Sequence, residues 1–172
     1  STRKESSAAS YVYKRQAFER LFEQPELILN AEIVPTLPLA FACSEYVAET
    51  LVRYPELTSE LFASGDLLRA LEAGELEARC SEVTAELFDA ASIKRALRLF
   101  RHRELVRIAW RDVCGLAELA DTLRELSELA DAFIGSALRW VEGDLFDRYG
   151  KPVAEDGTES QFVVLALSLI HI

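Results

Sequence analysis

Seven lysine and arginine side chains fall between residues 94 and 111, in a chain whose formal net charge is −10. A basic cluster of this kind suits two different roles. It can form a solvated helix surface that pairs with acidic neighbours. It can also form a docking face for an acidic or phosphorylated partner, because opposite charge attracts such a partner from solution. The sequence leaves both interpretations open.

Three further features have side-chain types that could do chemistry. His102 lies inside the basic run without a partner at a useful spacing, which favours a solvated or salt-bridged residue over a general base. Cys43 has no nearby histidine or lysine in the sequence, which favours a core position over a nucleophile. Asp144 and Asp147 are three residues apart and could share a cation, but without a third ligand they indicate ordinary surface charge.

Other common catalytic patterns are absent from the sequence. It contains no glycine-rich phosphate loop and no Asp-x-Asp pattern on a predicted strand. Three widely spaced cysteines and two histidines make a poor zinc site and a poor disulfide framework. The sequence therefore predicts no catalytic, cofactor-binding or metal-binding residue within this chain.

Helical periodicity dominates the stretches that would position these side chains. The pattern predicts a weak helix over 11–30, a connection over 33–38 and a clear helix over 39–54 with Cys43 and Val47 on its apolar face. Pro55 then opens a short helix that Gly65 stops. Further helices are predicted over 76–88, over 92–113 and from 116 to about 150.

The last two predicted helices differ in their apolar faces. In 92–113 the apolar face changes sides near His102, so that Arg103, Arg107 and Arg111 lie opposite the second apolar face; this indicates different neighbours at the two ends, or a bend. The final helix carries a predicted buried stripe and a predicted solvent side. The stripe is Leu116, Leu119, Leu123, Leu126, Ala130, Phe133, Ala137, Trp140 and Val141, and the solvent side is Glu118, Asp121, Glu125, Glu128 and Asp131.

Composition narrows the class of protein. Half of the 172 residues are apolar, enough for one domain with a sizeable core. The acidic balance argues against nucleic acid and against a membrane surface as general partners. No stretch reaches the roughly 20 apolar residues of a membrane span, and free thiols suit a reducing cytoplasm. We expect a mainly α, cytoplasmic protein.

A resemblance to a known family rests on four stretches that occur in order: CSEYVAETLVRYPEL, ALRLFRHRELVRIAWRD, LADTLRELSELADAFIGSALRW, and FDRYGKP followed by FVVLA. Together they resemble the amino-terminal, adenylyl-removing half of the bifunctional glutamine synthetase adenylyltransferase/adenylyl-removing enzymes, over about residues 39–166. The resemblance implies that one half of the enzyme transfers AMP from ATP to a tyrosine of glutamine synthetase. The other half removes AMP by phosphorolysis.

The same resemblance implies cofactors and partners for a full-length parent. Both reactions would use ATP or its products with Mg²⁺ held by paired aspartates on a strand. Glutamine synthetase would be the partner, together with a nitrogen-signalling regulatory protein that other parts of the parent would bind. In the family the strand matching Phe162–Leu165 leads into a glycine-rich loop, and Ala166 stands where glycine is frequent. Because the loop and the aspartates are missing, we expect this chain to bind neither cofactor and to be inactive.

The expected organisation has four parts. Residues 1–35 are unassigned, partly disordered or weakly helical, and 36–152 form a helical region. Residues 153–166 begin an α+β nucleotidyltransferase domain with its first strand. Leu167–Ile172 read as a translated library adapter, since CTG TCT CTT ATA CAC ATC encodes them. The alternative to an enzyme fragment is a non-enzymatic helical interaction module whose basic helix docks an acidic partner.

Overall fold

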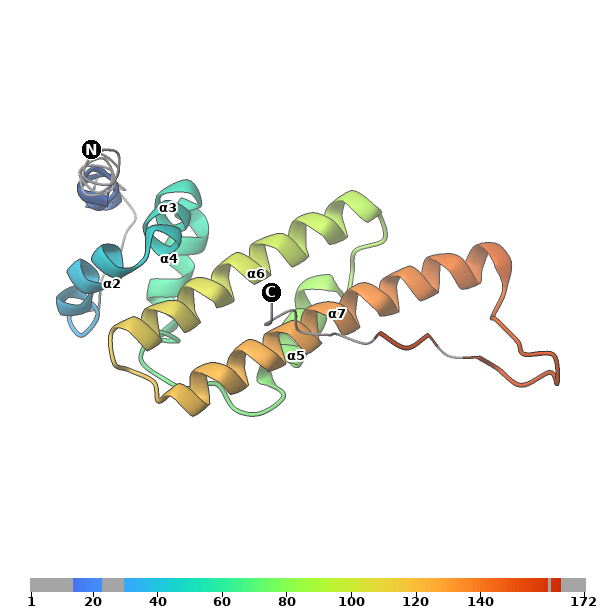
Figure 1. The fold of residues 1–172 in the computed structure, drawn as a ribbon. Coiled ribbons are helices and arrows are strands. Elements are labelled where there is room, and N and C mark those ends of the chain that lie inside the picture. The colour runs from blue at the N-terminus through green and yellow to red at the C-terminus, as the bar shows by residue number, and fades with distance from the viewer. Residues whose placement is uncertain (1–13, 23–29, 161, 165–172) are drawn as a thin grey trace, which may run out of the picture. The chain divides into compact units, whose positions relative to one another are not determined.

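The computed structural model describes residues 14–22, 30–160 and 162–164, and within them the chain is mainly helical, as the sequence predicts (Figure 1). The chain divides into two compact units, Ser1–Ser136 and Ala137–Ile172. A helical segment covers residues 14–22. The named helices are η1 (Val34–Thr36), α2 (Leu37–Cys43), α3 (Glu45–Arg53), α4 (Pro55–Ser64), α5 (Glu75–Thr84), α6 (Ala90–Val113) and α7 (Leu119–Tyr149).

Several helix boundaries follow from local sequence signals. Pro55 is the first residue of α4, and Gly65 ends it with a left-handed φ of 77°. Asp89 caps α6 by accepting hydrogen bonds from the backbone N–H groups of Ala91 and Ser92. Gly150, with a φ of 79°, follows the last residue of α7. These boundaries confirm the predicted breaks near residues 54, 65 and 150.

The predicted single helix over 39–54 is wrong, because the helix is interrupted at Ser44, between α2 and α3. Ser44 has extended backbone angles, φ −131° and ψ 111°, and its Oγ accepts a hydrogen bond from the Val47 N–H. Serine is a favoured N-cap because its hydroxyl satisfies an otherwise unpaired backbone donor. The break also corrects the prediction for Cys43, which ends α2 and is exposed rather than in the core.

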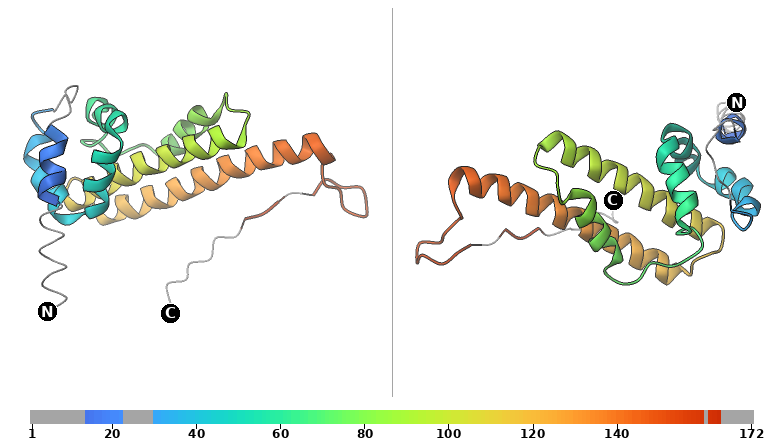
Figure 2. Two further views of the ribbon diagram at one scale, coloured as in Figure 1. Left: turned by 90° about the horizontal axis from the view of Figure 1, so that it is seen from above. Right: turned by 180° about the vertical axis from the view of Figure 1, so that it is seen from behind.

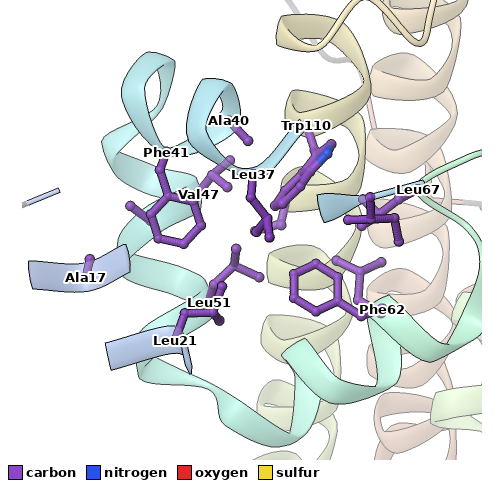
Figure 3. Packing of buried hydrophobic residues seen from close by; sticks show 14 residues of the cluster. Ala17, Leu21, Leu37, Ala40, Phe41, Val47, Leu51, Phe62, Leu67 and Trp110 are labelled. Atoms are coloured by element: carbon purple, nitrogen blue, oxygen red, sulfur yellow. The ribbon is translucent and has the colours of Figure 1, made fainter. Parts of the chain in front are cut away.

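The main hydrophobic core of the first unit joins α2, α3, α4 and the second half of α6. Figure 3 shows Trp110 of α6 among Leu37 and Ala40 of α2 and Phe62 of α4, all of them buried. The Phe62 and Trp110 rings meet edge to face with centroids 5.6 Å apart. The Trp110 indole N–H also donates to the Thr36 hydroxyl at 3.0 Å.

Helix α6 contacts α5, α4, α3 and α2 (Figure 2). Its first half buries Ile93, Leu97 and Phe100, and its second half buries Val106 and Trp110. The helix is continuous through the polar step around His102. The predicted exchange of apolar faces is therefore explained by different neighbours and not by an interruption of the helix.

The predicted buried stripe of α7 is largely wrong. Leu119, Leu123, Leu126 and Val141 are exposed by 69, 56, 38 and 44%. The buried residues of α7 are instead Thr122, Glu125, Leu129, Ala132 and Ser136. The helix is thus rotated so that a partly polar face points inward. The reason lies in charged side chains of α6: Glu125 pairs with Arg107, and the Thr122 hydroxyl donates to Asp112.

After α7, in the second unit, the chain makes one small antiparallel contact. Val153 and Glu159 form an isolated bridge, and the Ala154 N–H donates to the Thr158 carbonyl at 2.8 Å. Phe162–Val164 are not assigned to a strand and are exposed. The predicted nucleotidyltransferase strand at 162–166 stays a prediction, because its last two residues lie outside the described part.

Two further sequence-based interpretations also fall outside the described residues. They are the start of the unassigned amino-terminal region, over 1–13, and the adapter at Leu167–Ile172. Among the helices that the structure describes, none combines the length and apolarity that crossing a membrane requires.

Candidate functional site

The basic residues of α6 separate into two groups with opposite environments. Arg107 and Arg111 are buried, and the Arg103 side chain is only 13% exposed. The other group is at the surface and consists of Lys94, Arg95, Arg98 and Arg101. The inner group holds the first unit together, whereas the outer group is accessible to partners. The two groups are taken in turn.

Asp66, in the turn after α4, pairs with Arg103 of the inner group and with two other arginines. Its buried carboxylate accepts two hydrogen bonds from Arg79, at 2.6 and 3.1 Å, and one from Arg103 at 2.7 Å. Arg69 lies 2.9 Å away and also pairs with Glu75. Burial acts to raise the pKa of Asp66, but the hydrogen bonds and charges of Arg79 and Arg103 outweigh it and hold the pKa below its usual range.

A second set of buried charges links α6 to the first part of α7. Arg107 is fully buried, its Nε donates to Glu104 Oε2 at 2.6 Å, and its Nη1 lies 2.8 Å from Glu125 Oε2. The Arg107–Glu125 contact is an ion pair without hydrogen-bond geometry, and Nη2 of Arg107 has no acceptor among the described residues. Glu125 in turn accepts the Leu71 backbone N–H at 3.1 Å. These bonds explain why α7 turns Glu125 inward.

Arg111 completes the inner group by binding backbone carbonyls. Its guanidinium donates to the Leu67 carbonyl at 3.2 Å and to the Leu116 carbonyl at 2.9 Å. It therefore ties the turn after α4 to the end of α6. Arg107 and Arg111 are buried, so the side of α6 opposite its second apolar face is not a solvated surface. The predicted placement of Glu125 on the solvent side of its helix is wrong.

The carboxylates that pair with arginines should make the stability of the fold sensitive to acid. Hydrogen bonds, led by the one from Arg69, lower the pKa of Glu75 to about 2, and the pKa of Asp66 is lowered too. The unfolded chain binds protons to these groups at higher pH than the folded chain does. Their contribution to stability is therefore complete above about pH 5 and is lost as pH falls toward the folded pKa values. We expect urea unfolding to show a falling free energy below about pH 4.5.

Asp66→Asn tests this assignment, because it removes one of the two titrating groups. The variant should be less stable at pH 7 and should show a smaller loss between pH 5 and 3 than the unmodified chain. Asp131→Asn, at an exposed position of α7, makes the same charge change outside the group and should keep the original slope. Equal slopes in all three proteins would contradict the prediction.

Two residues of the outer group, Arg95 and Arg98, line an open groove between α4, α5 and the first half of α6. The groove has a volume of about 760 Å³. Its apolar lining comes from Leu57, Val83, Ala96, Leu99 and Phe100, and its basic lining from Arg53, Arg95, Arg98 and Arg103. The Arg103 guanidinium is already paired with Glu60 and Asp66. No ion pair in the described part of the chain involves the other three arginines.

His102 lies next to this groove between two tyrosines. Its Nδ1 is 2.8 Å from the Tyr46 hydroxyl, and its ring stacks on Tyr54 with centroids 5.1 Å apart. Burial, followed by the positive charges of Arg101 and other arginines nearby, lowers the pKa of His102. The neutral ring is therefore favoured. The structure replaces the predicted solvated or salt-bridged histidine by one held between aromatic rings.

The remaining candidates are brought to no common site. Cys43 is exposed, Cys80 is buried and Cys114 is partly buried. Asp144 pairs with Arg148 at 2.8 Å, as a surface carboxylate would. Within residues 14–22, 30–160 and 162–164, no group of three or more His, Cys, Asp or Glu side chains is arranged to hold a metal ion.

The sequence showed the basic cluster but not its division. The spacing of Arg103, Glu104 and Arg107 indicates local pairing along a helix. Their other partners are far away in the sequence: Arg103 bonds Asp66 at a separation of 37 residues and Glu60 at 43 residues. Arg107 contacts Glu125 of the next helix. No local pattern links such positions. A signal that could have helped was the placement of polar Thr122 and Glu125 one turn apart on a helix that follows a basic one.

The family of this chain follows from comparison with known proteins. The described site is an arginine-rich helical assembly with a basic groove. The sequence profile of the family described as glutamate–ammonia ligase adenylyltransferase matches residues 35–168. The chain belongs to this family, and glutamate–ammonia ligase is another name for glutamine synthetase.

Curated relatives carry the same name. The chain is similar to the bifunctional glutamine synthetase adenylyltransferase/adenylyl-removing enzyme of Thioalkalivibrio sulfidiphilus, with 44% identity over 127 residues, 74% of this chain and 13% of the relative. It is 35% identical to that of Nitrosococcus oceani over 153 residues, 87% of this chain and 16% of the relative. The enzyme of Hahella chejuensis is 34% identical over 152 residues, with the same shares. The chain thus spans less than a fifth of the length of these relatives.

Proposed function

We propose that this chain is a helical part of an enzyme that adenylylates a tyrosine of glutamine synthetase and removes the AMP by phosphorolysis, and that it belongs to the amino-terminal, adenylyl-removing half. The observation that supports this most is the family match over residues 35–168, which includes the whole arginine-rich helix α6. In such an enzyme the reaction would regulate nitrogen assimilation in the cytoplasm. A nitrogen-signalling regulatory protein would act through other parts of the parent.

The chemistry would come from outside the described residues. Phosphoryl and nucleotidyl transfer rely on Mg²⁺ and positively charged groups that neutralise phosphate oxygens. The inner arginines are engaged by carboxylates and carbonyls, and the described carboxylates do not form a metal-binding group. The residues present therefore do not fit an ATP–Mg²⁺ site. The role of this chain would be structural support and contact with the substrate protein.

A chimera tests this function. Residues 35–160 of this chain would replace the matching segment in the Thioalkalivibrio sulfidiphilus relative, and phosphate-dependent removal of labelled AMP from its adenylylated glutamine synthetase would be measured. We expect a rate within roughly tenfold of the unmodified relative, equivalent to about 1.4 kcal/mol in the barrier. A form of the relative with the segment deleted should be inactive. A folded chimera as inactive as the deletion would refute the proposal.

The isolated 172-residue chain should neither attach nor remove AMP, because the groups that bind nucleotide and metal would lie elsewhere. Incubation with glutamine synthetase, labelled ATP and Mg²⁺ checks attachment, and incubation with AMP-labelled glutamine synthetase, phosphate and Mg²⁺ checks removal, with the intact relative as the positive control in both assays. Turnover above background in a clean preparation would contradict the proposal that the nucleotide- and metal-binding groups lie outside this chain.

A further inference from the structure

Unpaired arginines concentrate at one apolar groove of an otherwise acidic chain. Arg53, Arg95 and Arg98 line the groove, are exposed and make no ion pair within the described residues. Arg53 only approaches the Tyr54 ring, at 5.6 Å from its centroid. By contrast, the basic residues of the inner group are paired within the first unit. Arg53, Arg95 and Arg98 are not needed to balance charge within the first unit, so their charge is available to a partner.

The floor of the same groove is apolar and partly open to solvent. Val83 of α5 is 44% exposed, and Leu57 and Leu99 are partly buried. Of the two carboxylates on the lining, Glu60 pairs with Arg103, and Glu56 has no ion pair within the described part. The free charges on the lining are therefore three positive and one negative. Apolar floor and positive rim together suit a segment in which apolar side chains alternate with carboxylates.

We propose that this groove binds an acidic segment of glutamine synthetase that places apolar side chains on Leu57, Val83 and Leu99 and carboxylates against Arg53, Arg95 and Arg98. The inference rests on the proposed function, because that function supplies the partner. It adds the surface of contact and the chemistry of the segment. Apolar contact gives affinity, and the arginine rim selects acidic segments and speeds their association.

The test measures binding of the full 172-residue chain to immobilised glutamine synthetase of Thioalkalivibrio sulfidiphilus. Arg95→Glu/Arg98→Glu should weaken binding roughly tenfold or more, because attraction at the rim becomes repulsion. The matched control is Lys94→Glu/Arg101→Glu, which makes the same charge change on the same helix at exposed positions outside the groove lining. It should change binding by less than about threefold, a long-range effect that salt screens.

A second pair of variants tests the apolar floor. Val83→Gln should weaken binding, whereas Val141→Gln should not, although both valines are 44% exposed. Circular dichroism and unfolding midpoints would verify that each variant keeps its fold; Arg95→Gln/Arg98→Gln replaces the charge-reversed pair if that pair is unfolded. The proposal is overturned if the two charge-reversed pairs weaken binding equally, if neither does, or if the unmodified chain does not bind.

These outcomes are distinct from failure of the proposed function. If the chain does not bind glutamine synthetase but the chimera still removes AMP, the groove proposal falls and the function stands. If binding depends on the groove but a folded chimera removes no AMP, the function falls and the docking surface stands.

Discussion

Glu104→Gln should lower the free energy of unfolding by about 3 kcal/mol at pH 7, the cost typical of breaking a buried ion pair by removing one partner. Glu104 is fully buried and faces Arg103 and Arg107. Without the charge of Glu104, the Arg107 ion pair that remains among the described residues is the one with Glu125, which lacks hydrogen-bond geometry. A fully buried guanidinium with incomplete pairing is costly because it cannot recover its lost hydration. Urea unfolding followed by far-ultraviolet circular dichroism measures the change.

Glu60→Gln is the matched control for this prediction. It makes the same substitution on another partner of Arg103, but the Glu60 side chain is 55% exposed. Surface ion pairs contribute only about 0.2–1 kcal/mol, because water and salt screen them. Arg107→Met alone and together with Glu104→Gln would complete a double-mutant cycle, for which we expect a coupling of at least about 1 kcal/mol. Equal losses in Glu104→Gln and Glu60→Gln would show that burial does not set the strength of this network.

Trp110→Ala should cost about 4 kcal/mol, within the usual range for truncating a buried aromatic side chain. Trp110 is fully buried, packs against Phe62 and donates to Thr36, so it joins η1, α4 and α6 at one point. Its removal leaves a cavity that several helices would have to collapse into together. The measurement is the unfolding midpoint and slope in urea, read from circular dichroism.

Two other variants show whether the cost arises from packing at this position. Trp110→Phe keeps most of the ring but loses the hydrogen bond to Thr36, and it should cost clearly less than the alanine variant. Phe88→Ala removes an aromatic ring that is 88% exposed and should change stability by less than about 0.5 kcal/mol. A similar loss for Phe88→Ala and Trp110→Ala would contradict the central position assigned to Trp110.

The helices and many of their ends follow from local sequence signals. Pro55, Gly65 and Gly150 act through their own backbone geometry, so their effect does not depend on the rest of the fold. Apolar spacing was sufficient for the buried positions in the first half of α6, such as Ile93 and Leu97. The break at Ser44 was missed because the apolar pattern continues across it, although serine is a frequent N-cap. The family was also recognisable from the order of its sequence stretches.

Which helix faces point inward depends on contacts between helices and not on local sequence. Periodicity locates apolar residues on a helix, but burial depends on what the neighbouring helix presents. On α7, Glu125 is buried and Leu123 is exposed, because Arg107 of α6 requires a carboxylate partner in the interior. Pairing with carboxylates and backbone carbonyls also distinguishes the interior Arg107 and Arg111 from the groove arginines Arg95 and Arg98. Charges far apart in the sequence satisfy each other only once the chain is folded, so no local pattern distinguishes a structural arginine from one that is free to bind a partner.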